Sequence, residues 1–315
     1  MRILIVGRYK TAYNDVSPFV REQAEALRLV GNEVEYFAIK GKGIKTYFLQ
    51  RKVLLRKIET FHPDIIHAHY GLSGLLCCLQ RYVPVVVTYH GSDINNPKVL
   101  HFSRMAMRLA AKNIFVSKGI LNKVTHCPNA VLLPCGIDLS DNQCTPKSLA
   151  RQKMNLSIDG QYALFAGAFD NAVKNSALAN DVVELYNRQT GNSCQLIELK
   201  GYSRQEVALL MCAADVFLLT SHNEGSPQVI KEAMACGCPI VSVDVGDVAE
   251  RLQGLDGCYV AQTYCTEDVA DKLRQALCFN ARTHGRERII EQGLDNRQVA
   301  KRLMEIYNIV CKKAI

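Results

Sequence analysis

Short, continuous apolar segments that alternate with amphipathic segments constrain the fold of this chain more than any other feature. The segments are apolar throughout rather than at every second position, which is typical of strands covered on both faces. Strands that alternate with helices along a chain form a parallel, doubly wound sheet. The sequence therefore predicts an α/β fold with Rossmann-like sheets. The strands are expected at residues 2–6, 33–39, 64–68, 84–89, 113–117, 130–134, 162–167, 194–199, 215–220, 239–243 and 258–261.

The polar segment 139–152 divides this series into six strands before it and five after it. A chain of 315 residues is also longer than one hydrophobic core normally supports. We therefore expect two doubly wound Rossmann-like domains, an N-terminal one at residues 1–142 and a C-terminal one at 143–295. A final helix at 296–315 can return to the first domain. Ligands of such sheets bind beyond the carboxyl ends of the strands, which we expect to face a cleft.

Composition limits the compartment and the partners. The 13 cysteines show no C-x-x-C pair and no zinc-ligand spacing, so we expect most of them to be buried in a reducing compartment and predict no metal site. The net charge of +8 suits a phosphate-bearing ligand or an anionic membrane and does not indicate nucleic acid. The chain begins without a signal-peptide pattern and has no long apolar stretch. We expect a cytoplasmic protein, with the inner face of the membrane as a second location.

The segment 215–246 carries the clearest chemical signal. A strand is followed by a polar loop, and a helix then begins with Ser226 as its expected cap. The backbone amides of Gly225 and Ser226 at that helix end can bind an anion. Glu224 precedes the helix and Glu232 lies about two turns into it, where carboxylates suit sugar hydroxyls. From spacing alone, the alternative is that Glu224 complements the helix dipole and Glu232 is solvated.

This segment resembles the retaining glycosyltransferases of family 4, which have the GT-B fold. The resemblance lies in a Glu, seven residues and a second Glu inside EGSPQVIKEAMACGCPIV. It covers residues 161–260 well and the first 140 more loosely. It implies transfer of a sugar from a nucleotide diphosphate sugar, which is a substrate, without a cofactor or an essential metal. It also implies that Glu224 contacts the donor sugar and Glu232 the ribose.

The segment ALFAGAFDNAVKN holds a second part of the expected donor site. Gly167 ends a strand where backbone can approach a ligand, and Lys174 offers a positive charge to a diphosphate. A solvated surface amine is the alternative for Lys174. The family usually has an Arg directly after this Gly, whereas this chain has Ala168. Lys118 and Arg204 are candidate replacements.

The first half of the chain contributes weaker candidates. His90 follows a strand in TYHGSDIN, and the resemblance implies that it reaches the donor sugar, although a packed histidine is the alternative. Asp93 is expected to cap the next helix, and Cys135 to have a structural role. The first loop is not a G-x-G-x-x-G fingerprint, which argues against a nicotinamide cofactor. Acceptor-side candidates in or near this loop are Gly7, Asn14 and Asp15.

Residues 40–61 have the pattern of one basic amphipathic helix. We expect Ile44, Phe48, Leu55 and Ile58 on one face, with Lys45, Lys52 and Arg56 on a neighbouring stripe. An ordinary surface helix is one interpretation. The other is peripheral contact of residues 44–61 with anionic lipid.

The sequence thus predicts a retaining glycosyltransferase that uses a nucleotide diphosphate sugar, with UDP favoured, and a glycan or lipid-linked acceptor in polysaccharide synthesis. Its catalytic candidates are Glu224, His90 and Lys174. A non-catalytic donor-binding subunit and a nucleotide-sugar epimerase are the alternatives. The interpretation requires Glu224 and Glu232 to share one site, and a buried ion pair at either carboxylate would contradict it.

Overall fold

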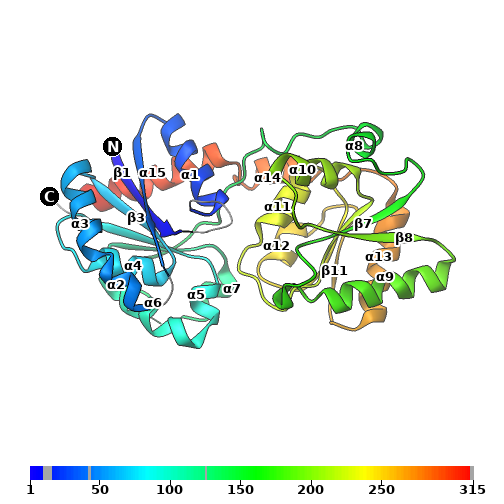
Figure 1. Ribbon diagram of the computed structural model, residues 1–315, viewed down its shortest axis with the longest axis horizontal. Coiled ribbons are helices and arrows are strands. Elements are labelled where there is room, and N and C mark those ends of the chain that lie inside the picture. The colour runs from blue at the N-terminus through cyan, green and yellow to red at the C-terminus, as the bar shows by residue number, and fades with distance from the viewer. Residues whose placement is uncertain (10–15, 42–43, 125, 313–315) are drawn as a thin grey trace. The chain divides into compact units, whose positions relative to one another are not determined.

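The computed structural model describes residues 1–9, 16–41, 44–124 and 126–312, without the side chains of residues 44–46. The chain forms two compact units. The first comprises Met1–Ile137 and Leu294–Ile315, and the second comprises Asp138–Gly293. Each has its own parallel sheet with helices on both faces (Figure 1). All eleven expected strands are present, which confirms the α/β fold.

The sheet of the first unit has the order β2-β1-β3-β4-β5-β6 and is parallel throughout. Its strands are β1 (Arg2–Arg8), β2 (Glu33–Ile39), β3 (Ile65–His69), β4 (Val85–Tyr89), β5 (Lys112–Phe115) and β6 (Ala130–Leu132). Its helices are α1 (Pro18–Leu29), α2 (Ile44–Leu49), α3 (Arg51–Phe61), α4 (Gly71–Cys78), α5 (Ser92–Asn95), α6 (Pro97–Leu109), α7 (Lys118–Leu121) and α15 (Asn296–Lys312).

Alternation along β1 shows why this sheet is covered on both sides. Leu4 and Val6 pack in a core under α3, α4 and α6, whereas Ile3 and Ile5 pack in a second core under α1 and α15. All four side chains are fully buried. Because successive strand residues point to opposite faces, an apolar run buries both faces at once.

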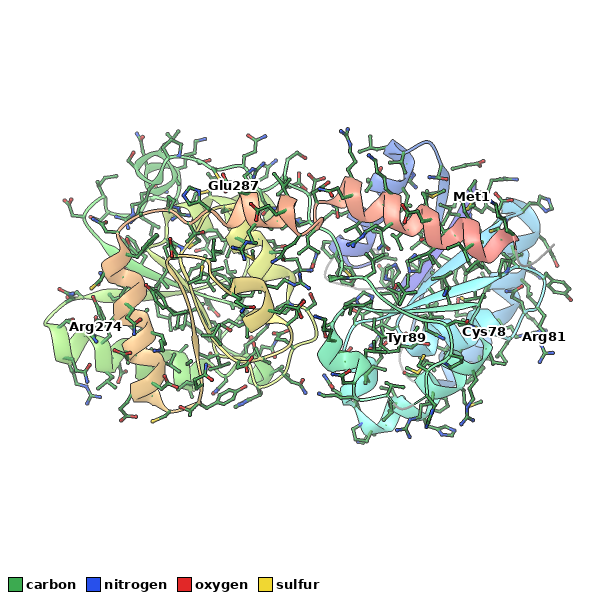
Figure 2. The ribbon with its side chains drawn as sticks, turned by 180° about the vertical axis from the view of Figure 1, so that it is seen from behind. Met1, Cys78, Arg81, Tyr89, Arg274 and Glu287 are labelled. Atoms are coloured by element: carbon green, nitrogen blue, oxygen red, sulfur yellow. The ribbon has the colours of Figure 1, made fainter. Side chains whose placement is uncertain are left out.

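The C-terminal helix α15 belongs to the first unit. It lies beside α1, and Figure 2 shows it across the strands when the molecule is seen from behind. Its Tyr307 hydroxyl bonds Nδ1 of His67 in β3. Leu303 and Tyr307 are fully buried among residues of β1 and β3. The helix is therefore part of the core of this unit.

The sheet of the second unit has the order β11-β10-β9-β7-β8 and is also parallel. Its strands are β7 (Gln161–Phe165), β8 (Cys194–Glu198), β9 (Val216–Leu219), β10 (Ile240–Val243) and β11 (Cys258–Ala261). Its helices are α8 (Lys147–Lys153), the 3-10 turn η2 (Ala172–Lys174), α9 (Ser176–Thr190), α10 (Arg204–Ala213), α11 (Gln228–Ala235), α12 (Val248–Leu252), α13 (Thr266–Phe279) and α14 (Gly285–Glu291).

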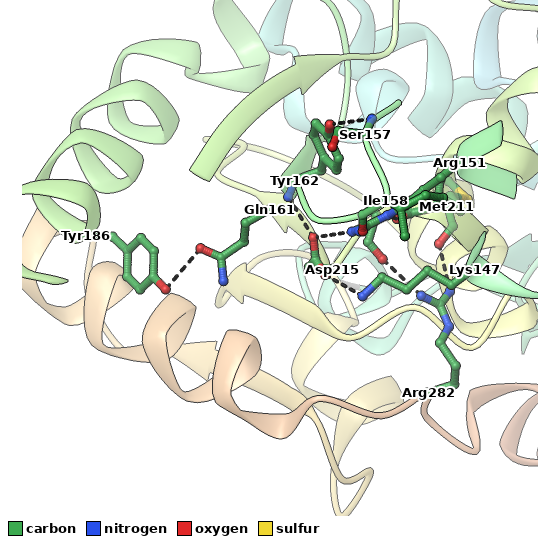
Figure 3. A network of polar contacts seen from close by, with 12 residues as sticks. Lys147, Arg151, Ser157, Ile158, Gln161, Tyr162, Tyr186, Met211, Asp215 and Arg282 are labelled. Carbon is green, nitrogen blue, oxygen red and sulfur yellow. Dashed lines mark hydrogen bonds and ion pairs between the residues drawn. The ribbon is translucent and has the colours of Figure 1, made fainter. Parts of the chain in front are cut away.

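One partly buried carboxylate attaches α8 to this sheet (Figure 3). Asp215 directly precedes β9, and its Oδ2 accepts hydrogen bonds from Arg151 Nη2 at 2.8 Å and from the Tyr162 amide at 2.7 Å. Its Oδ1 accepts one from Lys147 Nζ. The guanidinium of Arg151 is thereby paired where it is buried, which stabilises the contact.

The structure divides the chain a few residues earlier than the expected boundary at 142. Ile137 is bonded within the first unit, where its amide donates to Leu294 O and its carbonyl accepts from the Asn296 amide. In the second unit, Arg286 donates to the carbonyls of Leu139 and Asn142. These two sets of contacts place the division between residues 137 and 138.

Residues 40–61 form two helices, α2 and α3, rather than one. The face that packs on the sheet includes Tyr47, Leu54, Ile58 and Phe61. Phe48, which was expected to share one face with Ile58, is 40% exposed, whereas Ile58 is buried. The prediction of one helix with that face was therefore wrong, and the side chains of Ile44 and Lys45 lie outside the described residues.

Candidate functional site

The carboxyl end of β9 holds the loop that carries Lys174. Thr220 Oγ1 directs its hydroxyl toward two carbonyls, at 3.0 Å from Lys174 O and 2.9 Å from Asn175 O. The His222 amide donates to Val173 O at 2.9 Å. Asn175 has a left-handed backbone with a φ of 55°, a conformation in which asparagine is enriched. These contacts fix η2 against the end of the strand.

Lys174 and Glu224 lie in direct contact. Lys174 Nζ is 2.7 Å from Glu224 Oε1, and the two side chains are 18% and 17% exposed. The aliphatic part of Lys174 passes over Gly167, where a Cβ atom would come within 2.9 Å of Lys174 Cγ. A side chain at position 167 would collide with Lys174, which accounts for the glycine there. The pair is partly exposed rather than sealed in the core, so another charged group can reach either partner.

The helix that follows Glu224 begins one residue later than expected. Pro227 is the N-cap of α11, and Ser226 Oγ instead donates to Asp247 Oδ2 at 2.9 Å. Asp247 also accepts from Arg251 Nε at 2.9 Å, which holds the carboxylate in place beside the serine. The prediction of Ser226 as a side-chain cap was wrong, because the serine has this charged acceptor from the next strand–helix connection.

The loop before α11 leaves backbone donors at the helix N-terminus. Within the described residues, neither the Gly225 amide nor the Ser226 amide donates to a backbone carbonyl. Gly246 packs directly on this loop, because a Cβ atom there would lie 2.8 Å from Gly225 O. Its φ of +66° independently favours glycine. Both residues precede the N-cap Pro227, so anion binding by their amides stays a prediction.

Glu232 of α11 and Arg204 of α10 extend the same charged group of residues. Arg204 Nη2 is 3.7 Å from Glu232 Oε1, and the glutamate side chain is 19% exposed. Burial raises the pKa of the Glu232 carboxyl, although the positive charges of Arg204, Lys231 and Lys174 act in the opposite direction. Lys174 is therefore close enough to act on both Glu224 and Glu232. We call Lys174, Arg204, Glu224 and Glu232 the charged cluster.

The two residues considered as replacements for the missing arginine at Ala168 lie in different units. Arg204 lies in the charged cluster, whereas Lys118 begins α7 in the first unit. Sequence alone could not place Arg204, because its contact with Glu232 depends on how α10 and α11 pack.

His90 lies at the carboxyl end of β4 in the first unit and is held by a network of rings. Its Nε2 is 3.0 Å from His69 Nδ1, and its Nδ1 is 3.8 Å from Cys135 Sγ. The His69 ring stacks on it at a centroid distance of 5.2 Å, and the Phe19 ring lies 4.9 Å away. His69 is fully buried, and burial holds its pKa well below the usual value. His69 is therefore neutral in both of its contacts with His90, the one between ring nitrogens and the ring stacking.

The prediction that Asp93 caps the next helix was wrong, because Gly91 is the N-cap and Asp93 lies in the first turn of α5. Its Oδ1 accepts from the amides of His90 and Gly91, and its Oδ2 accepts from the Gly71 amide, each at 3.0 Å. It thus joins the ends of β3 and β4 and fixes the turn that carries His90. The sequence analysis missed His69. Its signal was the alternation of two histidines in HAHYG, which places His67 and His69 on the same side of β3.

The remaining candidates are the acceptor-side residues Gly7, Asn14 and Asp15. Gly7 is part of β1, paired with Ala38, rather than part of the loop that follows. A Cβ atom at Gly7 would lie 3.5 Å from Val16 Cγ1, an ordinary contact. Asn14 and Asp15 lie outside the described residues.

Two family models match the chain. The model described as Glycosyltransferase Family 4 matches residues 12–141. The model described as Glycosyl transferases group 1 matches residues 163–278, which contain the whole charged cluster.

Among curated proteins, the chain is similar to the TuaC protein of Bacillus subtilis, named for a glycosyltransferase of teichuronic acid biosynthesis. The two are 27% identical over 222 residues, which are 61% of this chain and 56% of that protein. The matched part thus spans little more than half of that relative.

Among solved structures, sucrose-phosphate synthase from Thermosynechococcus elongatus superposes with a TM-score of 0.80. It shares 18% identity, over 98% of each chain. HepE of Anabaena, in complex with UDP, superposes with a TM-score of 0.71 at 16% identity, over 98% of this chain and 100% of that one. At these identities the similarity shows the fold. Taken with the two family models, it shows that the chain has the GT-B fold and carries one domain of each of these two glycosyltransferase models.

Proposed function

We propose that this protein transfers a sugar, with retention of anomeric configuration, from a UDP-linked donor to a glycan or lipid-linked acceptor in cell-surface polysaccharide synthesis. The observation that carries the proposal is the contact between Lys174 and Glu224 at the start of α11. It places a cation, a carboxylate and two backbone amides together at the carboxyl end of a parallel sheet, where ligands of such sheets bind.

Each member of the charged cluster has a distinct proposed role. Lys174 and the amides of Gly225 and Ser226 bind the diphosphate and stabilise the negative charge that grows on it as the sugar leaves. Glu224 accepts hydrogen bonds from the hydroxyls of the sugar, and Glu232 from those of the ribose. Arg204 supplies a second positive charge to the nucleotide. With both cations in place, the donor needs no metal ion.

The proposed reaction forms one bond and breaks one at the anomeric carbon. The acceptor hydroxyl attacks on the face from which the diphosphate departs, and its proton passes to the departing phosphate oxygen. The resemblance implies that His90 contacts the donor sugar. Its stacking on His69 and its turn held by Asp93 support a defined orientation of that ring.

Two relatives support the choice of donor and acceptor. HepE has been crystallised with UDP, with UDP and glucose, and with UDP-glucose. TuaC is named for teichuronic acid biosynthesis, which is the assembly of a polysaccharide. We therefore propose UDP-glucose as the first donor to test.

The proposal is tested by Glu224→Ala, with Glu184→Ala on the exposed face of α9 as the control. UDP, GDP and ADP sugars are first compared by thermal shift, in which a donor at 100 times its Kd stabilises by about 2.7 kcal/mol. UDP release and product anomer are then followed with the donor that binds. Glu224→Ala should lose about 100-fold or more in turnover at an unchanged Tm, while the control keeps wild-type activity. Near-normal turnover of Glu224→Ala would refute the assignment.

Ala168 favours one alternative function, a non-catalytic donor-binding subunit, because the family usually has a cation at this position. The same assay distinguishes the two. A chain that binds a UDP sugar tightly but releases no UDP with any acceptor would be the binding subunit, and conversion of the donor without an acceptor would indicate an epimerase.

A further inference from the structure

Four cysteines gather where α10 and α11 end, and the Cys236 amide there donates to Glu232 O. Cys212 lies in the last turn of α10, and Cys236 is the C-cap of α11. Cys238 follows, and Cys144 comes from the connection before α8. Cys212, Cys236 and Cys238 are buried, whereas Cys144 is exposed.

One arginine shows how close the two helix ends are. Arg282 Nη2 donates both to Met211 O, at 2.7 Å, and to Cys236 O, at 2.9 Å (Figure 3 shows the contact with Met211). Its Nη1 donates to Ala214 O at 3.0 Å. Because a single nitrogen reaches the carbonyl before Cys212 and that of Cys236, the backbones at the two cysteines lie close together.

The connection before α8 crosses both helix ends. The Thr145 amide donates to Cys212 Sγ at 3.4 Å, and the Cys212 thiol lies 3.5 Å from Gln143 O. Cys144 Sγ lies 3.3 Å from Ala235 O. The Cys212 sulfur is thus in contact with the connection before α8, in which Gln143 and Cys144 are exposed.

The surroundings of the two thiols differ in a way that suits a nucleophile and its partner. A hydrogen bond from Cys236 lowers the pKa of the Cys212 thiol, and the Thr145 amide and the positive charge of Arg282 lower it further, against the effect of burial. The same hydrogen bond and burial raise the pKa of Cys236. Cys212 is therefore the sulfur that ionises first, and thiolates rather than thiols react with peroxides and disulfides.

We propose that Cys212 and Cys236 are a redox-active dithiol that hydrogen peroxide closes to a disulfide. The Cys212 thiolate attacks one peroxide oxygen, the O–O bond breaks, and the other oxygen leaves as water after taking a proton, which yields a sulfenic acid. The Cys236 sulfur then attacks that sulfur, the S–O bond breaks, and the hydroxyl leaves as water with the Cys236 proton. Two electrons pass from the thiols to the peroxide.

The disulfide would join the ends of the two helices that carry Arg204 and Glu232. Oxidation would therefore act on the packing of α10 against α11, which sets the distance between these two side chains. The proposal itself concerns the dithiol and does not depend on the proposed sugar transfer.

The test is mass spectrometry of the full, folded chain treated with hydrogen peroxide and then alkylated with N-ethylmaleimide. Trypsin is expected to place Cys212 alone in the peptide of residues 205–231, and Cys236 with Cys238 in that of residues 232–251. Non-reducing digestion should give these two peptides cross-linked, and fragmentation at Gly237 assigns the bond to Cys236. Dithiothreitol should restore both free thiols.

Cys212→Ser should abolish the cross-link, and Cys278→Ser, at an exposed cysteine of α13, should leave it unchanged. The cross-linked peptides of the wild-type protein test the proposal even if Cys212→Ser folds poorly. Cys212 and Cys236 that remain alkylatable after peroxide treatment would overturn the proposal. So would a cross-link of Cys212 to Cys144 instead of Cys236.

Discussion

The carboxyl of Glu232 should make UDP binding depend on pH. Burial raises its pKa, so this acid takes up a proton at a higher pH than an ordinary glutamate. A protonated carboxyl loses the charge that strengthens its bonds to hydroxyls. We therefore expect UDP affinity to fall on mild acidification, while Glu232→Gln binds UDP about 10- to 100-fold more weakly at neutral pH, a loss of about 1.5–3 kcal/mol, and shows little further change.

Isothermal titration of UDP into both proteins at a series of pH values measures this effect. Glu184→Gln on α9 is the control and should follow the wild type. A variant whose affinity falls in parallel with that of the wild type would show that Glu232 is not the titrating group.

Asp93 should make the stability of the first unit depend on pH. Burial raises its pKa from 3.8 to about 6, although the amides of Gly71, His90 and Gly91 act in the opposite direction. The folded state thus binds this proton more tightly than the unfolded state. The stability that results is present below the unfolded pKa and is lost as pH rises through about 6, by up to about 1.4 kcal/mol per pH unit.

Urea unfolding of the wild type and of Asp93→Asn across this range checks the prediction. The wild type should lose stability relative to the variant as pH rises from about 4 to about 6. Asp181→Asn, at an exposed position of α9, should keep the wild-type slope. Unfolding free energies of wild type and Asp93→Asn that run parallel would contradict the assignment.

At the scale of single residues, the sequence predicted which residues form the candidate site but not their contacts. The spacing of Glu224 and Glu232 resembles a family motif, so both could be named. The bond between Ser226 and Asp247 joins residues 21 apart in sequence, and it exists because β9 and β10 are neighbours in the sheet. The contact of His69 with His90 likewise depends on the pairing of β3 with β4.

At the scale of elements, the strands were predictable and the α2–α3 segment was not. A strand buried on both faces needs an unbroken apolar run, and the eleven strands have that pattern. The 40–61 segment has apolar residues on more than one face, so periodicity cannot say which of them packs on the sheet. The structure buries Tyr47 and Leu54 and leaves Leu49 76% exposed and Val53 49% exposed.

These exposed apolar side chains, beside exposed Lys52 and Arg56, predict contact of α2 and α3 with anionic lipid. No helix among the described residues has the length and hydropathy to span a bilayer. Flotation with anionic vesicles at low salt should recover the protein, and neutral vesicles should not. Leu49→Glu should reduce recovery by about tenfold or more, since burying a leucine contributes about 1.5–3 kcal/mol.

Leu29→Glu is the matched control, because Leu29 is 80% exposed at the end of α1. It should float as the wild type does. Equal recovery of wild type and Leu49→Glu would show that this surface is an ordinary solvated one.

For the whole molecule, the sequence could predict two sheets but not the point where the chain leaves each unit. The chain crosses between the units twice, after Ile137 and before Leu294. The two crossings are bonded to each other, because the Ile137 amide donates to Leu294 O. Such a pairing joins residues far apart in sequence, which no local pattern of polarity reveals. The chain enters α15 directly after Leu294, so this bond explains why that helix packs in the first unit.

This division makes the second unit testable by itself. Residues 138–293 contain a complete five-stranded sheet, both faces of which carry helices, and all of the charged cluster. The fragment should therefore unfold cooperatively and bind UDP within about tenfold of the affinity of the full chain, which is about 1.4 kcal/mol. Circular dichroism and titration calorimetry measure the two properties.

Lys174→Ala in the same fragment should lose most of the binding without loss of the fold, because it removes a cation that the diphosphate needs. A fragment that folds and yet binds no UDP, when the full chain does bind it, would show that the charged cluster alone is not the nucleotide site.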